Sequence, residues 1–443
     1  MMTRRNLSSA VFSCAAVILV FLLLFFGLRT VWGQVESFPE PDPPKVERDE
    51  EISQRRPTKT RAVIPATEWA YHKTPDNLHP DGNEQQMMWL MNRARANPTA
   101  EGIWLAAIYD RYIPYAPACS LMAEDQQFCY IASALDYWKV DLDLLQNEFA
   151  GYDAKPPAAF DVRLYRAAEA HSDYLISIDG QNHTEQFDRI IEENFSFIQA
   201  RGNVFSYALS AIYGHAAFNV DWGPDGGDGS GMQSNRGHRL AIMALDGSYS
   251  NVGIAAVAES DPSTQVGKLV ITGNYCKADP SAADHYNRFL VGTVWTDKDG
   301  DEFFDPDEGV GGVTVAPDQG TYYAITSNSG GYALPLETPG TYEVTFSGSA
   351  LDENVVKTLM VGDDSVLLDL VFEVASGQPG DENSAPLSDN SSDDGGGGGG
   401  GCFIAAIPNP YPATNMLFTV LGLFSVVLFV LAVVGRNYRT NLQ

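Results

Sequence analysis

Basic residues are few in this sequence. Of its 443 residues, 28 are Lys or Arg and 57 are Asp or Glu, which gives a formal net charge of −29 at pH 7. Proteins that bind nucleic acids neutralise phosphates with clustered Lys and Arg side chains. The composition therefore argues against a nucleic-acid-binding function. An acidic balance favours solubility and leaves some carboxylates free to gather around calcium.

Cysteine is also sparse. The five cysteines are Cys14, Cys119, Cys129, Cys276 and Cys402. No C-x-x-C pair is present, so neither a zinc ribbon nor a dithiol redox motif is indicated. Cys119 and Cys129 flank a short segment and can form a disulfide in an oxidising compartment, which would leave Cys276 unpaired. Spacing alone does not determine the pairing.

Two common hydrolase signatures are missing. The sequence contains no H-E-x-x-H motif, which places two zinc-binding histidines on one helix face. It also contains no G-x-S-x-G motif, which presents a nucleophilic serine on a strand-to-helix turn. Metalloprotease and serine-hydrolase chemistry of these types are therefore not indicated.

The N-terminus has the pattern of an export signal. Arg4 and Arg5 precede an apolar run over residues 10–27, and small residues follow near Gly33. This pattern predicts a secretory signal peptide that is cleaved before Gln34. An uncleaved signal anchor is the alternative, because the apolar run is long and rich in Phe and Leu. Either interpretation predicts an exported protein.

The C-terminus has the pattern of a membrane anchor. Residues 416–434 carry no charge and are long enough to form a transmembrane helix. Arg436 and Arg439 follow, and basic residues favour the cytoplasmic side of a membrane. A glycine run that ends at Gly401 precedes Cys402, an arrangement similar to bacterial C-terminal sorting signals. We therefore expect a protein anchored at the cell surface. Cys402 is a candidate processing site, and a simple flexible linker is the alternative.

Composition divides the chain into six segments. Residues 34–80 are polar and Pro-rich and cannot bury a core of their own. Helical patterns followed by strands predict an α+β domain next, and short β-rich runs between Gly, Asp and Pro turns predict a small β-sandwich after it. The predicted segments are a signal peptide (1–33), a disordered linker (34–80), an α+β domain (81–276), a β-sandwich (281–375), an acidic Gly/Ser-rich stalk (376–401) and an anchor (402–443).

Several elements of the α+β domain follow from local patterns. Asn83, with Gln86 three residues later, predicts the start of one helix. Apolar periodicity predicts a second helix that begins near Asp161 and a third over 205–219. Two β-rich runs, 252–257 and 269–272, are predicted to be strands.

Several stretches of this domain resemble the CAP superfamily, which includes cysteine-rich secretory proteins, antigen 5 and pathogenesis-related proteins. The resemblance is to the bacterial SCP-like type and covers residues 81–276. It implies an α-β-α sandwich with a central cavity. The stretches are MNRARANP (91–98), FDVRL (160–164), NHT (182–184), GHAAFNVDWG (214–223), GHR (237–239) and NVGI (251–254).

The resemblance implies a particular set of cavity residues. Members of the family usually hold two histidines and two acids in the cavity. The matching positions here are His183, His238 and Asp221. The second acid is normally a Glu directly before an Asn, and Gly202 stands at that place, before Asn203. The incomplete set puts acid-dependent chemistry in doubt.

Three functions remain open. Two imidazoles and a carboxylate are able to hold zinc, although they can equally hydrogen-bond nearby loops and only shape the cavity. A lipid- or small-molecule-binding protein does not need the missing acid, so it is the favoured interpretation. The first alternative is a metal-dependent surface hydrolase, in which an acid or a metal ion activates water. The second is a structural adhesin that contacts partners through the β-sandwich.

A twelve-residue acidic loop in the second domain has the spacing of a calcium site. Calcium takes six to eight oxygen ligands. Glycine is the fourth residue rather than the sixth, so this is not an EF-hand. The loop resembles those of Sdr-type B domains of surface adhesins and related carboxypeptidase-regulatory-like sandwiches. It predicts a calcium ion that stiffens the domain, and a solvated acidic turn is the alternative. The candidate ligands are Asp297, Asp299, Asp301, Phe303, Asp305 and Glu308.

Overall fold

The computed structural model describes residues 65–122, 125–224, 228–348 and 350–373. The predicted signal peptide, the first part of the linker, the stalk, Cys402 and the predicted span at 416–434 lie outside these residues. Among the described residues, no helix is both long and apolar enough to cross a bilayer.

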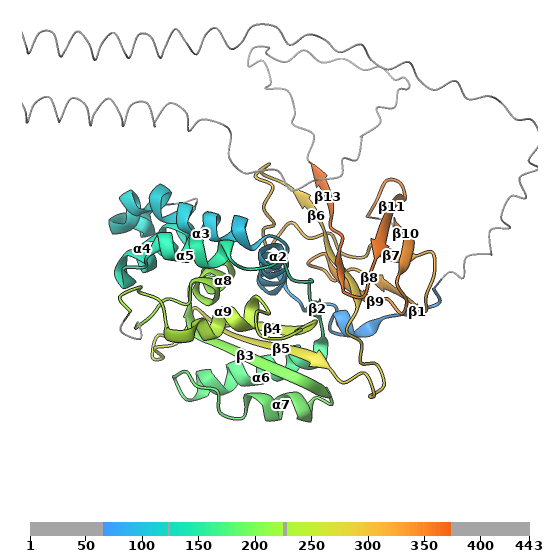
Figure 1. Ribbon diagram of the computed structural model, residues 1–443, viewed down its shortest axis with the longest axis horizontal. Helices are drawn as coiled ribbons and strands as arrows, with labels where there is room; N and C mark the ends of the chain where they lie inside the picture. The colour runs from blue at the N-terminus through green and yellow to red at the C-terminus, as the bar shows by residue number, and fades with distance from the viewer. Residues whose placement is uncertain (1–64, 123–124, 225–227, 349, 374–443) are drawn as a thin grey trace, which may run out of the picture. The chain divides into compact units, whose positions relative to one another are not determined.

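The first part of the fold is built on a four-stranded sheet. Its strand order is β2 (Ala159–Phe160), β4 (Asn251–Ala258), β5 (Leu269–Ala278) and β3 (Phe197–Ala208), so β3 is an edge strand. Helices α6 (Val162–Ser177) and α7 (Gln186–Glu192) pack on one face (Figure 1). Helices α2 (Gly82–Ala96), α8 (Ala211–Val220) and α9 (Gly237–Ile242) lie over the other. The combination of helices and sheets confirms the α+β class.

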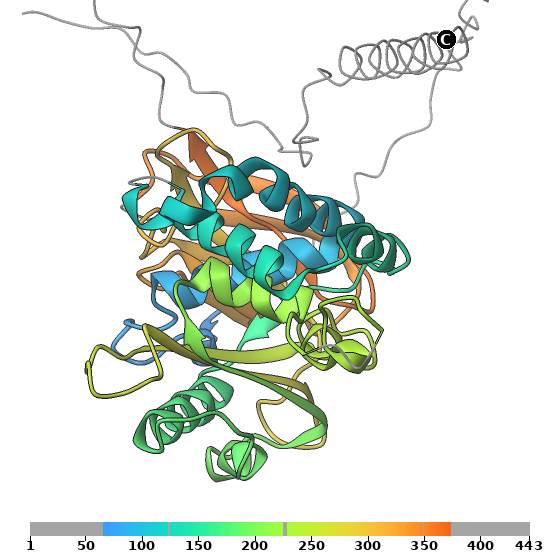
Figure 2. The same ribbon diagram turned by 90° about the vertical axis from the view of Figure 1, so that its left-hand side faces the viewer.

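Beyond α2 and α8 lies a group of helices that the sequence analysis did not identify. It consists of α3 (Pro98–Tyr112), η2 (Ile113–Leu121), α4 (Gln126–Trp138) and α5 (Leu142–Ala150), and Figure 2 shows it above the sheet. The Asn97 side chain accepts a hydrogen bond from the backbone N–H of Ala100, and Pro98 fills the first position of α3. Asn followed by Pro is a standard helix start. A disulfide between Cys119 and Cys129 joins η2 to α4.

The second part of the fold has two β-sheets. One has the order β1 (Thr67–Glu68), β8 (Tyr322–Ile325), β7 (Thr314–Pro317), β10 (Gly340–Ser347) and β11 (Val355–Val361). In the other, β6 (Phe289–Asp297) pairs with β9 (Gly331–Pro335), β12 (Val366–Leu367) and β13 (Leu370–Glu373). Alternate residues of β10 are buried, as expected for a strand with one face on a core. Leu290 of β6 and Val344 of β10 belong to one apolar cluster, so both sheets share a core.

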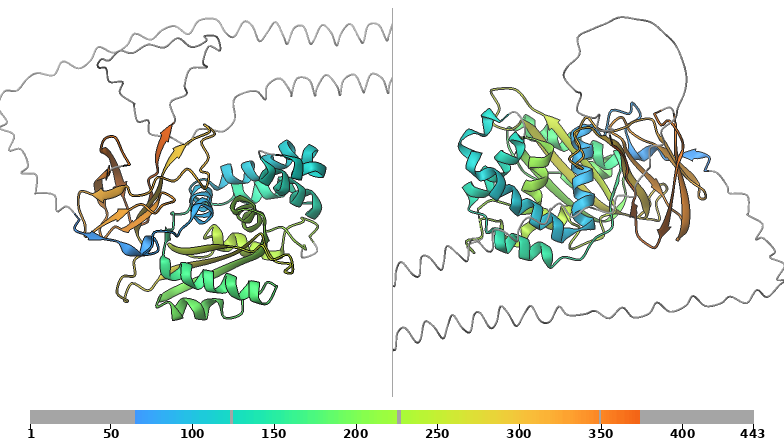
Figure 3. Two further views of the ribbon diagram at one scale, coloured as in Figure 1. Left: turned by 180° about the vertical axis from the view of Figure 1, so that it is seen from behind. Right: turned by 90° about the horizontal axis from the view of Figure 1, so that it is seen from above.

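Residues 65–80 are folded, and the prediction of a linker is wrong for this part. Strand β1 pairs with β8 in parallel, and Figure 3 shows this blue segment beside the orange strands. Trp69 is 3% exposed and packs against the rings of Tyr286 and Tyr322. The polar, Pro-rich composition of the whole segment concealed this short aromatic stretch. The β-sheets therefore contain residues that precede the α+β domain in the sequence as well as residues that follow it.

Two predicted helix starts are corrected by capping geometry. Helix α2 is capped by Asp81 rather than Asn83, because Asp81 accepts the backbone N–H of Glu84 and the Glu84 carboxylate accepts the N–H of Asp81. The predicted helix over 205–219 begins too early, since residues up to Ala208 continue β3 and Ser210 caps α8.

Other local predictions are confirmed. Asp161 caps α6, where its side chain accepts the backbone N–H of Arg163. The runs 252–257 and 269–272 lie within β4 and β5.

Replacing Trp69 by Ala should destabilise the fold strongly. Removal of a buried aromatic side chain costs about 3–5 kcal/mol, because it leaves a cavity as well as losing apolar burial. Urea unfolding of the full chain, followed by circular dichroism, measures the loss. Leu78→Ala in the same segment is the control, since Leu78 is 57% exposed. Equal stability of the two variants would show that the segment is not part of the core.

Candidate functional site

The residues that the sequence analysis places in a cavity lie around the edge strand β3. Successive side chains of a strand point to opposite faces of its sheet. At Gly202 the nearest side chain is that of Gln186, which begins α7. At Asn203 the side chain donates to the backbone carbonyl of His238, the second residue of α9. The two predicted histidines are therefore held from opposite faces, at adjacent residues of one strand.

His238 is fixed by three hydrogen bonds. Its backbone N–H donates to Asp221 Oδ2 (3.0 Å), and its ring Nδ1 lies 2.7 Å from Asp221 Oδ1. Asn203 Nδ2 donates to its carbonyl oxygen (2.9 Å). The ring also stacks on Phe218, with ring centroids 5.7 Å apart. A carboxylate only accepts hydrogen bonds, so Nδ1 carries the proton and Nε2 remains available.

Asp221 owes its position to the end of α8. It is the C-cap of that helix, with a left-handed backbone conformation (φ 56°) that Asp tolerates better than most residues. Its backbone N–H closes the helix on the carbonyl of Ala217. The residue thus terminates its helix and orients His238 with a fully buried carboxylate.

His183 is held in the same way by a neutral group. Its Nδ1 lies 2.7 Å from Gln186 Oε1. Gln186 Nε2 donates to Asn274 Oδ1 (2.9 Å) and to the carbonyl of Gly273 (3.3 Å), and Asn274 Nδ2 donates to the carbonyl of Leu164 (3.1 Å). Backbone carbonyls cannot donate, so they fix the orientation of both amides. His183 Nδ1 therefore carries a proton.

Gln186 fills the place where the sequence analysis looked for an acid. A Cβ atom on Gly202 would lie 2.5–2.7 Å from the amide atoms of Gln186, which is closer than real contacts allow. Gln186 is fully buried. The sequence analysis missed it because an uncharged amide in another segment carries no motif. Its proximity to Gly202 arises only from the packing of α7 on β3.

A buried histidine supports the loop that carries His183. His171 Nε2 donates to the carbonyl of Asn182, and Arg189 bonds its Nδ1. Burial, together with the charge of Arg189, lowers the pKa of His171 to about 4. His171 is therefore a neutral structural residue, and Arg189 also donates to the carbonyl of Thr184.

The described residues bring two sets of metal-ligating side chains together. In each set one ligand atom per residue lies within 4.8 Å of the others, and the sets are His79–Asp81–Glu84 and Asp297–Asp299–Glu308. Neither set contains His183, Asp221 or His238. The first set is explained by the capping box of α2. The second belongs to the predicted calcium loop.

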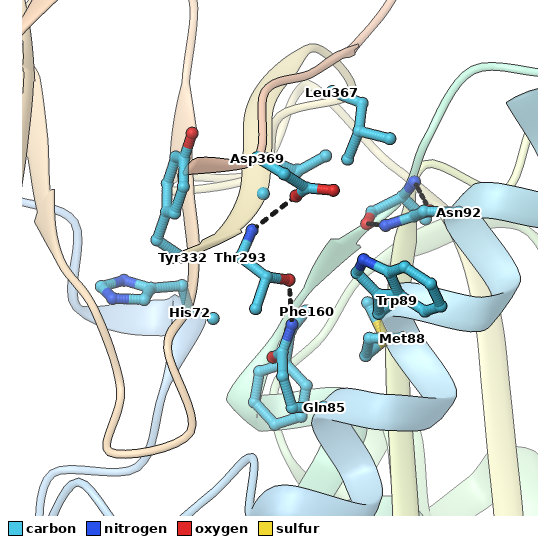
Figure 4. A pocket seen from close by; sticks show the side chains of 14 residues that line it. His72, Gln85, Met88, Trp89, Asn92, Phe160, Thr293, Tyr332, Leu367 and Asp369 are labelled. Carbon is cyan, nitrogen blue, oxygen red and sulfur yellow. Dashed lines mark hydrogen bonds between the residues drawn. The ribbon is translucent and has the colours of Figure 1, made fainter. Parts of the chain in front are cut away.

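A small cavity lies where α2 meets β6 (Figure 4). Its volume is about 20 Å³, which is enough for roughly one water molecule. Beside it, Gln85 Nε2 donates to Thr293 Oγ1 (2.8 Å), and the backbone N–H of Thr293 donates to Asp369 Oδ1 (2.7 Å). Burial raises the pKa of Asp369 to about 6. The cavity is therefore a small gap of mixed lining between α2 and β6.

A second, open groove of about 720 Å³ lies at the ends of β4 and β5. Its lining includes Leu209, Ser210, Val266 and residues 258–261. Neither cavity is lined by His183 or His238.

The acidic loop gathers three of its predicted ligands, Asp297, Asp299 and Glu308. The loop backbone supports them. The N–H groups of Gly300 and Glu302 donate to the Asp297 carboxylate, and those of Lys298 and Asp305 donate to the Glu308 carboxylate. These contacts fold the loop around its acids.

The other predicted ligands surround this set. Burial, followed by repulsion from neighbouring carboxylates, raises the pKa of Asp301 and of Asp305 to about 6. The ring of Phe303 packs against Trp89 of α2 and Trp104 of α3, at centroid distances of 5.1 and 6.0 Å. The loop is thus held against the α+β domain.

Comparisons with known proteins identify no family. No family model matches the chain, and no curated protein matches it. Among solved structures, it is similar to an extracellular protein containing an SCP domain from Bacillus anthracis. That match has a TM-score of 0.21 and 15% sequence identity, and it covers 35% of this chain and 44% of the other. A likeness of this degree does not identify the fold or the function.

Without divalent cations, the stability of the loop should fall as the pH rises from about 4 to about 6. Asp301 and Asp305 titrate near 6 when folded, against an ordinary value of 3.8, so the folded state binds more protons in this window. Melting temperatures measured in chelator across this range test the sign. The double variant Asp301→Asn/Asp305→Asn should show a flatter profile than the wild type. Identical profiles would contradict the prediction.

Proposed function

We propose that the chain is an exported surface protein whose CAP-like α-β-α domain binds a lipid or other small molecule beside His183 and His238. The observation that carries this proposal is the matched arrangement of the two imidazoles. Each is held through Nδ1–H by a buried side-chain oxygen, and the two histidines are supported beside adjacent residues of the edge strand β3, Gly202 and Asn203. Fixing one ring nitrogen in this way is how proteins prepare the other to bind a ligand.

Binding is favoured over hydrolysis by the state of the nearby polar groups. Both oxygens of Asp221 are engaged by His238, so this carboxylate orients the ring rather than activating water directly. Gln186 is neutral and occupies the space beside Gly202, where a second acid would stand. A hydrolase remains the second candidate, because a histidine that is oriented by a carboxylate is able to act as a general base. In that case a bound zinc ion would have to supply the missing activation.

Export is supported by the disulfide between Cys119 and Cys129, since such bonds persist in oxidising compartments. The signal peptide, the transmembrane anchor at 416–434 and processing at Cys402 complete the proposal, and they rest on the sequence pattern alone.

We also propose that the acidic loop binds calcium and thereby stabilises the β-sheets that pack against the α+β domain. Three carboxylates within reach of one ion support this, as does the raised pKa of their acidic neighbours. A contact role for the β-sheets is the further alternative. It is supported by Val356 and Met360, which are 56% and 81% exposed on the edge strand β11.

Changing both histidines should abolish retention of a bound molecule. Native mass spectrometry of the full chain, purified from a secreting host, compares His183→Ala/His238→Ala with the wild type. Asp188→Ala is the matched control, because Asp188 is exposed on α7, two residues from Gln186. We expect occupancy to fall at least about tenfold in the double variant only. Zinc in place of an organic ligand, with turnover of an ester probe, would instead favour the hydrolase.

Calcium should raise the melting temperature of the full chain, and Asp299→Asn should remove the effect. A loop that brings several carboxylates together is stabilised by a cation that neutralises their mutual repulsion. Asp307→Asn is the control, because Asp307 is exposed and pairs with Lys298 outside the gathered set. Differential scanning calorimetry in calcium and in chelator measures the shift. A calcium response that Asp299→Asn leaves intact would place the ion elsewhere.

A further inference from the structure

The acidic loop lies directly on helix α2. The backbone carbonyl of Phe304 and Asp305 Oδ1 both accept hydrogen bonds from Gln86 Nε2, at 3.0 and 3.1 Å. At the start of the same helix, a Cβ atom on Gly82 would fall 2.2 Å from the carbonyl oxygen of Pro306. Only glycine allows the loop to approach the helix this closely. Three consecutive residues of the loop therefore contact α2.

The ring of Phe303 extends this contact to α3. It stacks on Trp104 and packs edge-on against Trp89 of α2. The guanidinium carbon of Arg93 lies 4.4 Å from the ring centroid of Trp104 and 5.2 Å from that of Phe303. A cation over an aromatic face is attracted more strongly when it is shielded from water. Phe303 therefore completes an aromatic environment for Arg93 that α2, α3 and the loop build together.

Arg93 connects this contact to the interior of the α+β domain. Its Nη2 donates to Glu101 Oε2 (2.8 Å), in the first turn of α3. Glu101 Oε1 lies 2.9 Å from His215 Nε2 of α8, and the side chains of Glu101 and His215 are both buried. Breaking a buried ion pair is costly, because one charge is left uncompensated. The loop therefore covers a polar network that joins α2, α3 and α8.

The same loop holds two buried carboxylates close together. Asp297 and Glu308 are 5% and 3% exposed, and Asp299 lies within reach of the same ion. The side chain of Lys298 pairs with Asp307 instead of with these three acids. Buried carboxylates this close together repel one another unless a cation joins them. A bound cation would therefore stabilise the loop in the conformation that gathers the acids.

Asp305 links the gathered acids to the helix. Its backbone N–H donates to Glu308 Oε2 (2.9 Å), while its side chain accepts from Gln86 of α2. A movement that separates the acids must also disturb the contact with α2. The gathering of the acids and the packing of the loop on the helices therefore belong to one conformation.

We propose that calcium bound in this loop controls how firmly the β-sheets pack against the α+β domain, with Phe303 as the residue that carries the contact to α3. This inference rests on the proposed binding of calcium by the loop. Calcium stabilises the conformation in which Phe303 lies between Trp89 and Trp104. Because the coupling of two binding events is reciprocal, loss of the aromatic contact weakens calcium binding.

The first test disturbs the contact from the side of the α+β domain. Trp104→Leu removes the α3 ring that stacks on Phe303 and leaves every carboxylate of the loop unchanged. Titration of the full chain with calcium alone, followed by calorimetry, should show about tenfold weaker binding in this variant. Ile103→Ala is the control, because Ile103 is the neighbouring residue of α3 and is 37% exposed. Equal calcium affinity in Trp104→Leu and the wild type would overturn the proposal.

The second test needs no substitution in the helices. Hydrogen exchange of the full chain is measured by mass spectrometry in calcium and in chelator. Calcium should slow exchange in α3, residues 98–112, about tenfold and leave α7, residues 186–192, unchanged as an internal reference. Phe303→Leu keeps the backbone carbonyl at residue 303 and should lose most of this protection while it still binds calcium. Calcium binding without slower exchange in α3 of the wild type would contradict the proposal.

The outcome is distinguishable from that of the proposed function. If calcium binds and raises the melting temperature, while exchange in α3 and the affinity of Trp104→Leu do not change, only the control of the domain contact is wrong. If the full chain binds no calcium, both proposals are wrong.

Discussion

The structure depends on the burial of α2 on nearly all sides. A helix that is buried all round belongs to the centre of a protein, and its polar side chains must then find internal partners. Gln85 bonds Thr293 of β6, and Gln86 bonds the carbonyl of Phe304 in the acidic loop. On the opposite side, the fully buried Arg95 donates to the carbonyls of Ile242 and Tyr249. The same helix therefore joins the β-sheets to the α+β domain. Such bonds fix the orientation of the parts, because each would leave an unsatisfied buried group if it were broken.

This constraint extends to the candidate site. Arg95 bonds the carbonyl of Ile242, the last residue of α9, and the second residue of that helix is His238. At its other end α9 is tied to Asp221, and through Asn203 to β3. The imidazole is thus placed by contacts from three separate elements, none of which reaches its Nε2. A ring held in this way loses little freedom when it binds a ligand, which is the general advantage of a pre-organised site. The position of Nε2 follows from the packing of the whole domain rather than from its own loop.

The sequence was sufficient wherever the information is local. The start of α6 near Asp161 and the strands β4 and β5 follow from propensity and periodicity, which act over a few residues. His183, Asp221 and His238 were predicted because the resemblance rests on contiguous motifs, and the structure places Asp221 against His238. Gln186 could not be found in this way, because it occupies the space where a side chain at residue 202 would lie, and only the packed structure shows this proximity. Trp69 was missed for a related reason. Its partners Tyr286 and Tyr322 are more than two hundred residues away in the sequence, so the composition of its neighbours gave no sign of burial.

The pairing of Gly202 with Gln186 also shows how an uncharged side chain can fill the space beside His183. Deleting a side chain from a packed interior normally leaves a cavity whose cost grows with its volume. Here the space beside Gly202 is filled by the side chain of Gln186 from α7, which also keeps the imidazole of His183 hydrogen-bonded. An amide here need not reduce stability, since a buried carboxylate requires compensation that a satisfied amide does not. His238, which retains its carboxylate, shows that the fold tolerates the charged arrangement as well. The two histidines thus differ in the charge of the side chain that holds Nδ1, while the hydrogen bond that holds each of them has the same length.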